Sequence, residues 1–177
     1  MRSRRLAGSA AIALALGACA QLPAPVPGDD NDPLAAEAVL ATMDRYLAAI
    51  AAKDLATMKA LDMPGGMTWS ARRNAAGEMV VSARPATWWT DPANESDSAL
   101  QERYWNPTVL VRGPVAMVWA PYEFKVDGKV SHCGVDVFDF VKVDGAWRVA
   151  NAMWTVEPDA CAELRPKDAS TIRPPAP

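Results

Sequence analysis

The feature that most constrains the fold is the β-rich last third of the chain. Three long runs, Val115–Val126, Lys129–Val143 and Ala146–Val156, are rich in Val, Phe and Trp, residues that favour strands. Asp127-Gly128 separates the first two runs and Asp144-Gly145 separates the last two. Asp-Gly between two strand-like runs is a strong signal for a tight hairpin turn. The sequence therefore predicts a three-stranded antiparallel meander.

Two helices are predicted upstream of the meander. Asp32 is a good N-cap, and Pro33 suits the first helical position. Apolar residues then recur at helical spacing and form one face that runs to Ala52; they are Leu34, Val39, Leu40, Met43, Tyr46, Leu47 and Ile50. Asp54 can cap a shorter second helix, which we expect to end at the Met-Pro-Gly-Gly segment of residues 63–66.

The middle of the chain is predicted to be mixed. Met67–Arg72 and Glu78–Ala83 have the pattern of two short strands, and Thr108–Arg112 that of a third. We expect a short helical turn around Thr87–Thr90 and a further helical piece over Ala99–Tyr104. Helices first and an antiparallel meander last are typical of the α+β class. We therefore predict an α+β domain in which N-terminal helices pack on a curved antiparallel sheet.

The longest strand run has two apolar faces. Because side chains alternate along a strand, one face carries His132, Gly134, Asp136, Phe138 and Phe140, and the other carries Cys133, Val135, Val137, Asp139 and Val141. A sheet covered on one side only would alternate more cleanly between apolar and polar residues. The second face is therefore either covered by a partner, such as a second copy of the chain in a homodimer, or it lines a cavity.

The order of these elements resembles that of the nuclear-transport-factor-2-like domains, which have the cystatin-like cone fold. The resemblance rests on Val115–Tyr122, on Phe124 with the turn that follows it, on Ser131–Asp136, and on Gly145–Val149, which is similar to the closing strand of that superfamily. It covers residues 34–162. The superfamily includes isomerases, dehydratases and cyclases as well as members with no known activity. The resemblance therefore implies the fold and leaves the chemistry open.

The N-terminus has the pattern of an export signal. Met1–Arg5 is basic, and Leu6–Gly17 is an apolar run too short to span a bilayer comfortably. The sequence Leu-Gly-Ala-Cys at 16–19 resembles a bacterial lipobox, which implies that Cys19 is lipidated and that the protein lies on the periplasmic side of the outer membrane. Plain secretion, into the periplasm or beyond it, is the alternative, because Ala18-Cys19-Ala20 also satisfies the cleavage rule.

The export signal sets the expected domain organisation. Residues 1–19 would be the signal peptide with its lipobox, 20–33 a Pro-rich tether, 34–162 the folded domain and 163–177 a Pro-rich disordered tail. Export also places Cys133 and Cys161 in an oxidising compartment. We expect a disulfide between them that closes a loop of about 29 residues, and two unpaired thiols are the alternative.

Charge and residue types exclude several classes of function. The formal net charge is −3, and it falls to about −6 once Arg2, Arg4 and Arg5 leave with the signal segment. No cluster of Lys and Arg follows that segment, so nucleic acid is not an expected partner. His132 and Cys133 point to opposite faces of their strand and cannot bind one metal ion together. We expect neither a metal site nor a cofactor.

His132 and Asp136 are the candidate catalytic residues. His132 is the only histidine of the chain, and the two side chains share one strand face at roughly 13 Å from each other. They are too far apart to touch but can contact one ligand from opposite ends. If Asp136 faces a cavity, burial should raise the pKa of its carboxyl, as an acid or base role requires. The alternatives are a hydrogen-bonded strand histidine and a surface salt bridge of Asp136.

Aromatic residues point to a ligand pocket. Seven Trp and three Tyr in a small domain suit a concave pocket with an apolar wall and few polar groups. We expect Trp147 to lie in the core and the pocket to be lined by Tyr46, Trp69, Trp105, Trp119, Tyr122 and Trp154. The leading hypothesis is binding of a small apolar or aromatic molecule, or of a protein partner, without catalysis. The alternatives are an isomerase, dehydratase or cyclase that uses His132 and Asp136, and a purely structural dimer.

Overall fold

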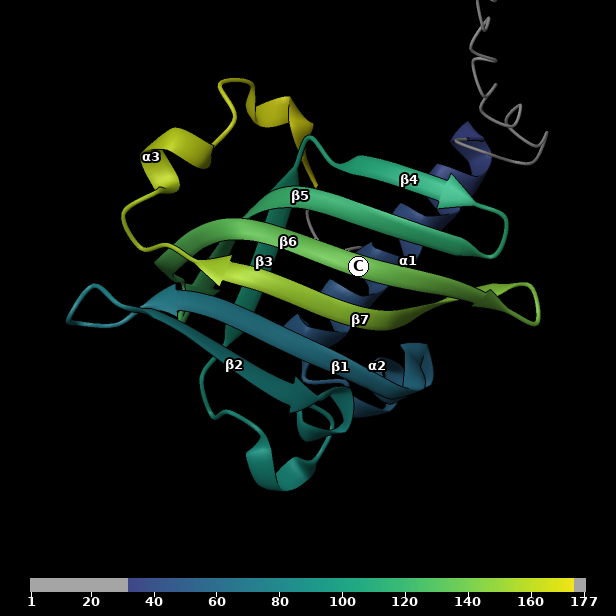
Figure 1. The fold of residues 1–177 in the computed structure, drawn as a ribbon, viewed down its shortest axis with the longest axis horizontal. Coiled ribbons are helices and arrows are strands. Elements are labelled where there is room, and N and C mark those ends of the chain that lie inside the picture. The colour runs from purple at the N-terminus through teal and green to yellow at the C-terminus, as the bar shows by residue number, and fades with distance from the viewer. Residues whose placement is uncertain (1–31, 174–177) are drawn as a thin grey trace, which may run out of the picture.

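A computed structural model describes residues 32–173 of the chain, in which helices lie across one face of a curved sheet (Figure 1). Helix α1 (Pro33–Ala52) crosses the inner face of the sheet, and the short α2 (Leu55–Leu61) follows it. The predicted α+β class is confirmed. The predictions for the signal peptide, the lipobox and nearly all of the tether lie outside the described residues. Within residues 32–173, no helix is both long and apolar enough to cross a bilayer.

Eight strands of the described chain form one sheet. They are β1 (Asp62–Arg73), β2 (Met79–Pro85), β3 (Leu100–Trp105), β4 (Thr108–Arg112), β5 (Val115–Val126), β6 (Lys129–Val143), β7 (Ala146–Val156) and β8 (Ile172–Arg173). Their order across the sheet is β2-β1-β7-β6-β5-β3-β8, and β4 also pairs with β5. The meander of β5, β6 and β7 is confirmed. The sheet is mixed rather than wholly antiparallel, because β1 runs parallel to β7 and no hairpin constrains the direction of that pair.

The caps of α1 and α2 are those expected. The Asp32 carboxylate accepts a hydrogen bond from the Leu34 backbone N–H at 3.0 Å, and Lys53 ends the helix in the left-handed conformation. The Asp54 carboxylate accepts from the Thr57 backbone N–H at 2.9 Å and starts α2. Residues 63–66, expected as a turn, are instead the start of β1, since the chain passes from Leu61 directly into that strand.

The prediction of a helical piece over Ala99–Tyr104 is wrong. This segment forms β3, in which Leu100 lies opposite Val126 and Tyr104 opposite Tyr122 of β5. Its Gln, Glu and Arg residues favour helix by intrinsic propensity, but pairing with a long strand and burial of alternate side chains override that preference. The difference matters because β3 places Glu102 on the buried face of the sheet.

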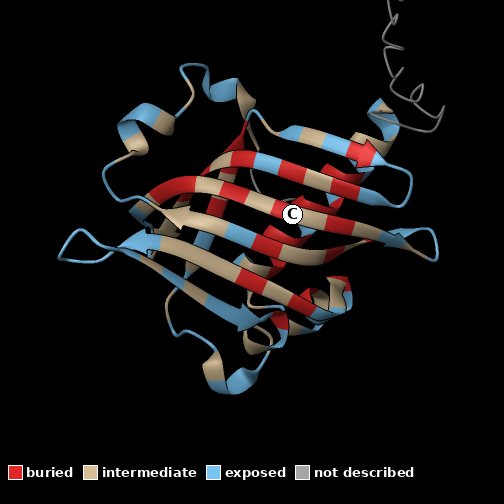
Figure 2. Ribbon diagram, viewed as in Figure 1, coloured by how far each residue is buried: buried red, intermediate tan, exposed pale blue. Residues whose placement is uncertain are grey.

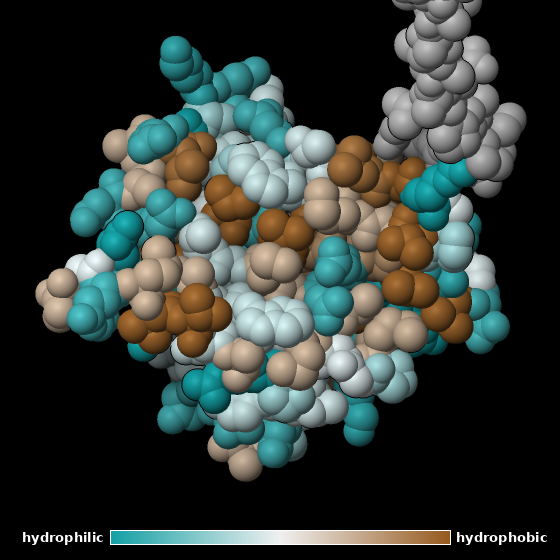
Figure 3. All heavy atoms as spheres, in the orientation of Figure 1, coloured by the Kyte–Doolittle hydropathy of each residue, from teal (hydrophilic) through white to brown (hydrophobic). Residues whose placement is uncertain are grey.

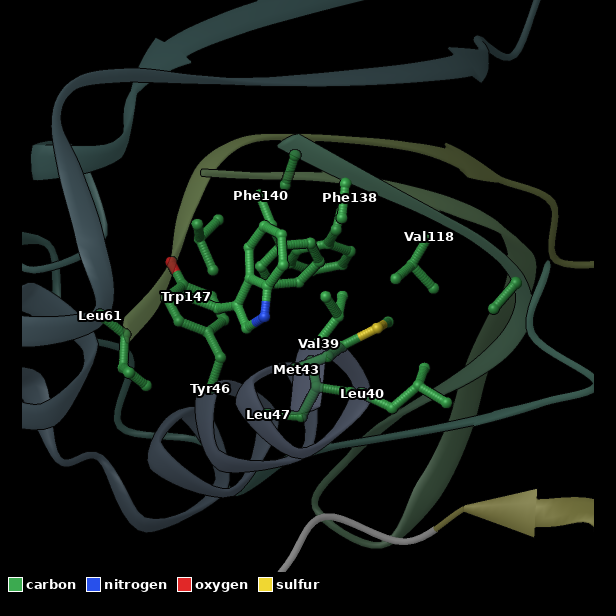
Figure 4. Close-up of a cluster of buried hydrophobic side chains, with 14 of the residues drawn as sticks. Val39, Leu40, Met43, Tyr46, Leu47, Leu61, Val118, Phe138, Phe140 and Trp147 are labelled. Carbon is green, nitrogen blue, oxygen red and sulfur yellow. The ribbon is translucent and has the colours of Figure 1, made fainter. Parts of the chain in front are cut away.

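The core lies between α1 and the inner face of the sheet. Figure 4 shows the side chains of one face of α1 pointing at aromatic and aliphatic residues of the strands. The residues that it labels are Val39, Leu40, Met43, Tyr46, Leu47, Leu61, Val118, Phe138, Phe140 and Trp147. Trp147 is buried in this cluster, as predicted.

Burial alternates along the strands of the meander (Figure 2). On β6 the buried positions include Asp136, Phe138 and Phe140, and these side chains face α1. The sequence leaves open which face of this strand is the inner one. The packing of α1 makes the face with His132 and Asp136 the inner face.

The disulfide Cys133–Cys161 is confirmed. Cys133 lies on the outer face of β6, and Cys161 begins the short helix α3 (Cys161–Leu164). Their Cα atoms are 5.0 Å apart, within the range of an ordinary disulfide. The bond fixes the chain that follows β7 against the outer face of the sheet.

The predicted disordered tail over 163–177 is wrong for residues 163–173. Arg165 forms an ion pair with Glu123, whose side chain is buried on the outer face of β5. Arg173 on β8 lies 2.7 Å from the Asp44 carboxylate of α1, and β8 pairs with the edge of β3. Proline and charged residues in this segment predict disorder. The segment is ordered instead because its arginines pair with the buried carboxylates of Glu123 and Asp44.

An apolar row on the outer face of the sheet is left uncovered by the described chain. Trp119, Val137, Met153 and Trp69 are neighbours across β5, β6, β7 and β1. Trp119 is 42% and Met153 44% exposed. Figure 3 views this face and shows hydrophobic side chains spread over the strands between polar ones.

Candidate functional site

A cavity opens between the inner face of the sheet, the C-terminal end of α1 and the segment before β3. Its volume is about 380 Å³, which suits a small organic molecule. The wall is mainly apolar and comprises Tyr46, Ile50, Leu55, Met58, Trp88, Trp89, Leu100, Tyr122, Phe124, Phe138, Ala152 and Trp154. The polar lining residues are Lys53, Thr68, Asn94, Glu95, Ser96, Glu102, His132 and Asp136.

Two tryptophans close the side of the cavity next to β1. Trp88 ends the short 3-10 helix η1 (Ala86–Trp88), and Trp89 follows it. The Trp89 Nε1–H donates a hydrogen bond to the Thr68 hydroxyl at 2.9 Å, and the Trp89 ring meets Trp154 edge-on with centroids 5.9 Å apart. This polar anchor and the aromatic contact hold the indole as part of the wall.

Three of the six residues predicted for the pocket line this cavity, namely Tyr46, Tyr122 and Trp154. The prediction is wrong for Trp69, Trp105 and Trp119. Trp69 and Trp119 point to the outer face of the sheet, because alternation puts them opposite to the buried positions of their strands. Trp105 is buried elsewhere, and its Nε1–H donates to the Leu164 carbonyl at 2.7 Å.

Two buried carboxyls, Glu102 and Asp136, face each other in the cavity wall. Glu102 is on β3 and Asp136 on β6, on either side of β5. Asp136 is 3% and Glu102 9% exposed. Within the described residues, neither carboxyl forms an ion pair with Lys, Arg or His, and Glu102 Oε1 and Asp136 Oδ2 are buried without a hydrogen-bond donor. An isolated pair of buried carboxylates is very costly, so the pair must retain a proton.

The pKa values of this pair are raised. Burial raises the pKa of Glu102 to about 7, against the lowering effect of a hydrogen bond from Asp136. Burial raises the pKa of Asp136 well above its usual value, and the neighbouring Glu102 raises it further by charge repulsion and by accepting the hydrogen bond. At neutral pH the two carboxyls therefore share at least one proton and titrate as a unit.

Glu102 is not among the predicted site residues, because the helical propensity of its segment predicts a helix there. Leu100, Glu102 and Tyr104 do alternate with a period of two, which is the signal that identifies a strand. A carboxylate between apolar neighbours on that face would then have been a candidate for a buried acid.

His132 lies on the same wall as Asp136, and Phe124 of β5 lies between His132 and Glu102 in the strand register. Its ring stacks on Phe124 with centroids 5.3 Å apart and meets Tyr122 edge-on at 5.6 Å. Burial lowers the pKa of His132, so the ring is neutral at pH 7. The predicted acid or base role of His132 stays a prediction, and its ring position fits stacking against a ligand equally well.

Gly134 lies between these two residues and brings Tyr122 against β6. A Cβ atom on Gly134 would be 2.1 Å from the Thr155 carbonyl oxygen and 2.8 Å from Cε1 of Tyr122, so any larger side chain is excluded. The Tyr122 hydroxyl donates to that same carbonyl at 2.7 Å. Burial and the nearby carboxyls raise the pKa of Tyr122, which keeps this hydroxyl protonated.

A third acid with a raised pKa, the half-buried Asp62, lies next to Tyr46 of the cavity wall. Burial raises the pKa of Asp62 to about 6, against the lowering effect of a hydrogen bond from Tyr46. At pH 7 Asp62 is therefore mostly ionised, whereas the Glu102–Asp136 pair still retains a proton. Within residues 32–173, no three His, Cys, Asp or Glu side chains are grouped as metal ligands.

The fold is shared with several solved structures. A protein of unknown function with a cystatin-like fold from Nostoc punctiforme matches with a TM-score of 0.55 and 11% identity over 70% of this chain and 91% of that one. A protein of the same fold family from Streptomyces avermitilis, assigned as a dehydratase, matches with a TM-score of 0.53 and 12% identity over 71% of this chain and 98% of that one.

A third match is the β subunit assigned to an aromatic-ring-hydroxylating dioxygenase of Novosphingobium aromaticivorans. Its TM-score is 0.59, with 13% identity over 71% of this chain and 91% of that one. The chain has the nuclear-transport-factor-2-like cone fold. The resemblance inferred from the sequence is therefore confirmed for the fold of this cone domain. No protein-family model matches the chain, and no curated protein sequence does.

The carboxyl pair makes the stability of the cone domain depend on pH. In the unfolded chain Glu102 loses its proton near pH 4.5, whereas in the folded chain it keeps it to about pH 7. Between these values the folded state binds more protons, so rising pH favours unfolding. The free energy of unfolding should fall by on the order of 3 kcal/mol over this interval because of the pair.

Urea unfolding at pH 5 and pH 8 measures this effect. The double variant Glu102→Gln/Asp136→Asn should lose most of the decline, keep the smaller part that Asp62 contributes, and be more stable than the natural protein at pH 8. Glu95→Gln, at the exposed rim of the cavity, is the matched control and should keep the decline. An equal decline in the natural protein and the double variant would show that the pair ionises as freely as carboxyls in water.

Proposed function

We propose that the cone binds a small, largely apolar or aromatic molecule and that the Glu102–Asp136 pair contacts a polar group of it. The observation that carries this proposal is a cavity of about 380 Å³ whose apolar wall contains two buried carboxyl oxygens without a donor. Two carboxyls that share a proton can both donate and accept a hydrogen bond, which suits a hydroxyl or carbonyl group. His132 and Phe124, which also line the cavity, would contact the apolar body of the same molecule.

Binding of the neutral fluorescent dye N-phenyl-1-naphthylamine tests the pocket. We expect a saturable increase in dye fluorescence with the natural protein. Ala152→Phe places a ring in the cavity and should abolish binding, because Ala152 lines the wall. Met153→Phe is the control, since the adjacent side chain points to the outer face and is 44% exposed.

Circular dichroism and urea unfolding establish that both variants are folded. Equal dye binding by the natural protein and Ala152→Phe would contradict a ligand site in the cone. Loss of binding in Met153→Phe alone would place the dye on the outer face instead.

Acid–base catalysis is a second candidate function, favoured by the raised pKa values of the pair. A carboxyl that titrates near neutral pH is suited to proton transfer, and its retention at a cost in stability is typical of functional sites. One structure with the same fold is assigned as a dehydratase. Removal of a proton next to a carbonyl, as in isomerisation or dehydration, is the reaction class that this pair suits best.

The ketone 2-tetralone is a probe for such chemistry because it combines an aromatic body with acidic C–H groups. In D₂O, proton NMR should show exchange of these hydrogens that the protein accelerates by about 10²–10⁴-fold, the usual contribution of one positioned acid or base. Asp136→Asn should remove the acceleration, and Asp139→Asn, on the outer face of the same strand, should not. Bound tetralone that exchanges no faster than free tetralone would contradict catalysis and leave binding intact.

We also propose that the domain acts in the bacterial cell envelope, anchored through a lipid on Cys19. The export signal supports this proposal, and so does the Cys133–Cys161 disulfide, which is typical of oxidising compartments. In bacteria, mass spectrometry of the natural mature chain should find an N-terminal diacylglyceryl cysteine, and Cys19→Ser should not be lipidated. An unmodified mature chain that begins at Gln21 would show plain secretion.

The outer apolar row supports a further proposal, a homodimer in which two sheets pack face to face. Light scattering should give twice the chain mass for the mature protein, and Trp119→Glu should give one chain mass. Leu34→Glu, which also replaces an exposed apolar residue but lies on α1, should remain dimeric. A monomeric natural protein at micromolar concentration would contradict this assembly.

A further inference from the structure

A second hollow adjoins the cone cavity on the inner face of β1 and β2. Its volume is about 240 Å³, and it shares Thr68, Trp89 and Trp154 with the main cavity. Its other lining residues are Ser70, Arg72, Ser82 and Arg84. We call this hollow the basic groove, since it is lined by two arginines and by no Asp or Glu.

The register of β1 and β2 builds the basic groove. Ser70 lies directly opposite Ser82, and Thr68 opposite Arg84. Residues two apart on a strand share a face, so Thr68, Ser70 and Arg72 line the groove together. Hydroxyl and guanidinium donors therefore converge on one side of the sheet, in an otherwise acidic chain.

Four donor side chains of the groove have no ion-pair or hydrogen-bond partner within the described residues, whereas the Thr68 hydroxyl donates to the Arg84 carbonyl at 3.3 Å. Arg72 and Arg84 form no ion pair there, and the Ser70 and Ser82 hydroxyls have no hydrogen-bond partner. The Arg84 guanidinium lies 4.3 Å from the centroid of the Trp88 ring, a cation–π contact that limits its motion. A guanidinium held this way offers its N–H groups to a carboxylate, sulfonate or phosphate at little entropic cost.

The groove and Asp136 lie on one transverse row of the sheet. Asp136 is opposite Trp154, Trp154 is opposite Ser70, and Ser70 is opposite Ser82. Two strand spacings separate Asp136 from Ser70, which is about 10 Å. A single small molecule can therefore reach from the main cavity into the groove past Trp154.

We propose that the basic groove is an anion subsite and that the ligand of the cone is an organic anion with an apolar or aromatic body. This inference rests on the proposed binding function of the cavity and names the class of its ligand. The body occupies the main cavity, and its carboxylate, sulfonate or phosphate group lies between Arg72 and Arg84. The anionic group is thereby kept away from Glu102 and Asp136, whose negative charge would repel it once the pair ionises.

Two dyes with the same body test this inference. 1-Anilinonaphthalene-8-sulfonate differs from N-phenyl-1-naphthylamine by one sulfonate, so the ratio of their dissociation constants reports recognition of the anion. The double variant Arg72→Gln/Arg84→Gln should weaken binding of the sulfonated dye by about tenfold or more and leave binding of the neutral dye unchanged. Arg73→Gln is the matched control, because Arg73 is next in the chain but donates to the Gly77 carbonyl in the hairpin turn at 2.8 Å.

The outcomes separate the two proposals. If the neutral dye binds and the double variant binds the sulfonated dye as tightly as the natural protein, the anion subsite is wrong and the cavity proposal stands. If Arg73→Gln has the same effect as the double variant, the preference reflects overall charge and the subsite is again wrong. If neither dye binds, both proposals fail.

Discussion

The packing of α1 into the curved sheet is the interaction on which the rest of the structure depends. One face of the helix buries Val39, Met43 and Leu47 against the strands, and each such side chain contributes roughly 1.5–3 kcal/mol by leaving water. The helix fills only part of the cone. Its last turns, from Tyr46 to Lys53, form one wall of an open cavity instead. The same contact therefore stabilises the fold and leaves space for a ligand.

Burial of Glu102 and Asp136 in the inner wall of that cavity lowers the free energy of unfolding, and the fold itself does not require carboxyls there. Apolar side chains at 102 and 136 would pack without the penalty of burying carboxyls. Glu102 and Asp136 are buried among aromatic rings, and the pair stays partly protonated because the charged forms are poorly solvated there. Two arginines, Arg72 and Arg84, line the basic groove on the other side of Trp154. The concave face therefore has carboxyl groups at one end and guanidinium groups at the other, and these groups would orient a polar ligand.

The C-terminal segment is bonded to the outer face of the sheet and to its β3 edge. The disulfide joins α3 to β6, Arg165 and Arg103 pair with the buried carboxylate of Glu123, and β8 extends the sheet beyond β3. Burial opposes ionisation of Glu123, but hydrogen bonds from the two arginines outweigh it and lower the pKa of that carboxyl. The pKa values of two buried acids on opposite faces of neighbouring strands thus shift in opposite directions: that of Glu123 is lowered because it has cations beside it, and that of Asp136 is raised because it is buried with a second carboxyl beside it instead.

The sequence by itself determined the helix caps at Asp32 and Asp54, the meander with its two Asp-Gly turns, and the pairing of the two cysteines, because these depend on local geometry or on the compartment. It also singled out Asp136, since a lone acid between valines is conspicuous. It did not place Glu102, because the segment around it has helical propensity and becomes a strand only by pairing with β5. Nor did it separate the pocket aromatics from Trp69 and Trp119, since alternation defines two faces and only the position of α1 decides which is inside. The carboxyl pair and the basic groove both join residues from different strands, so tertiary structure alone brought them together.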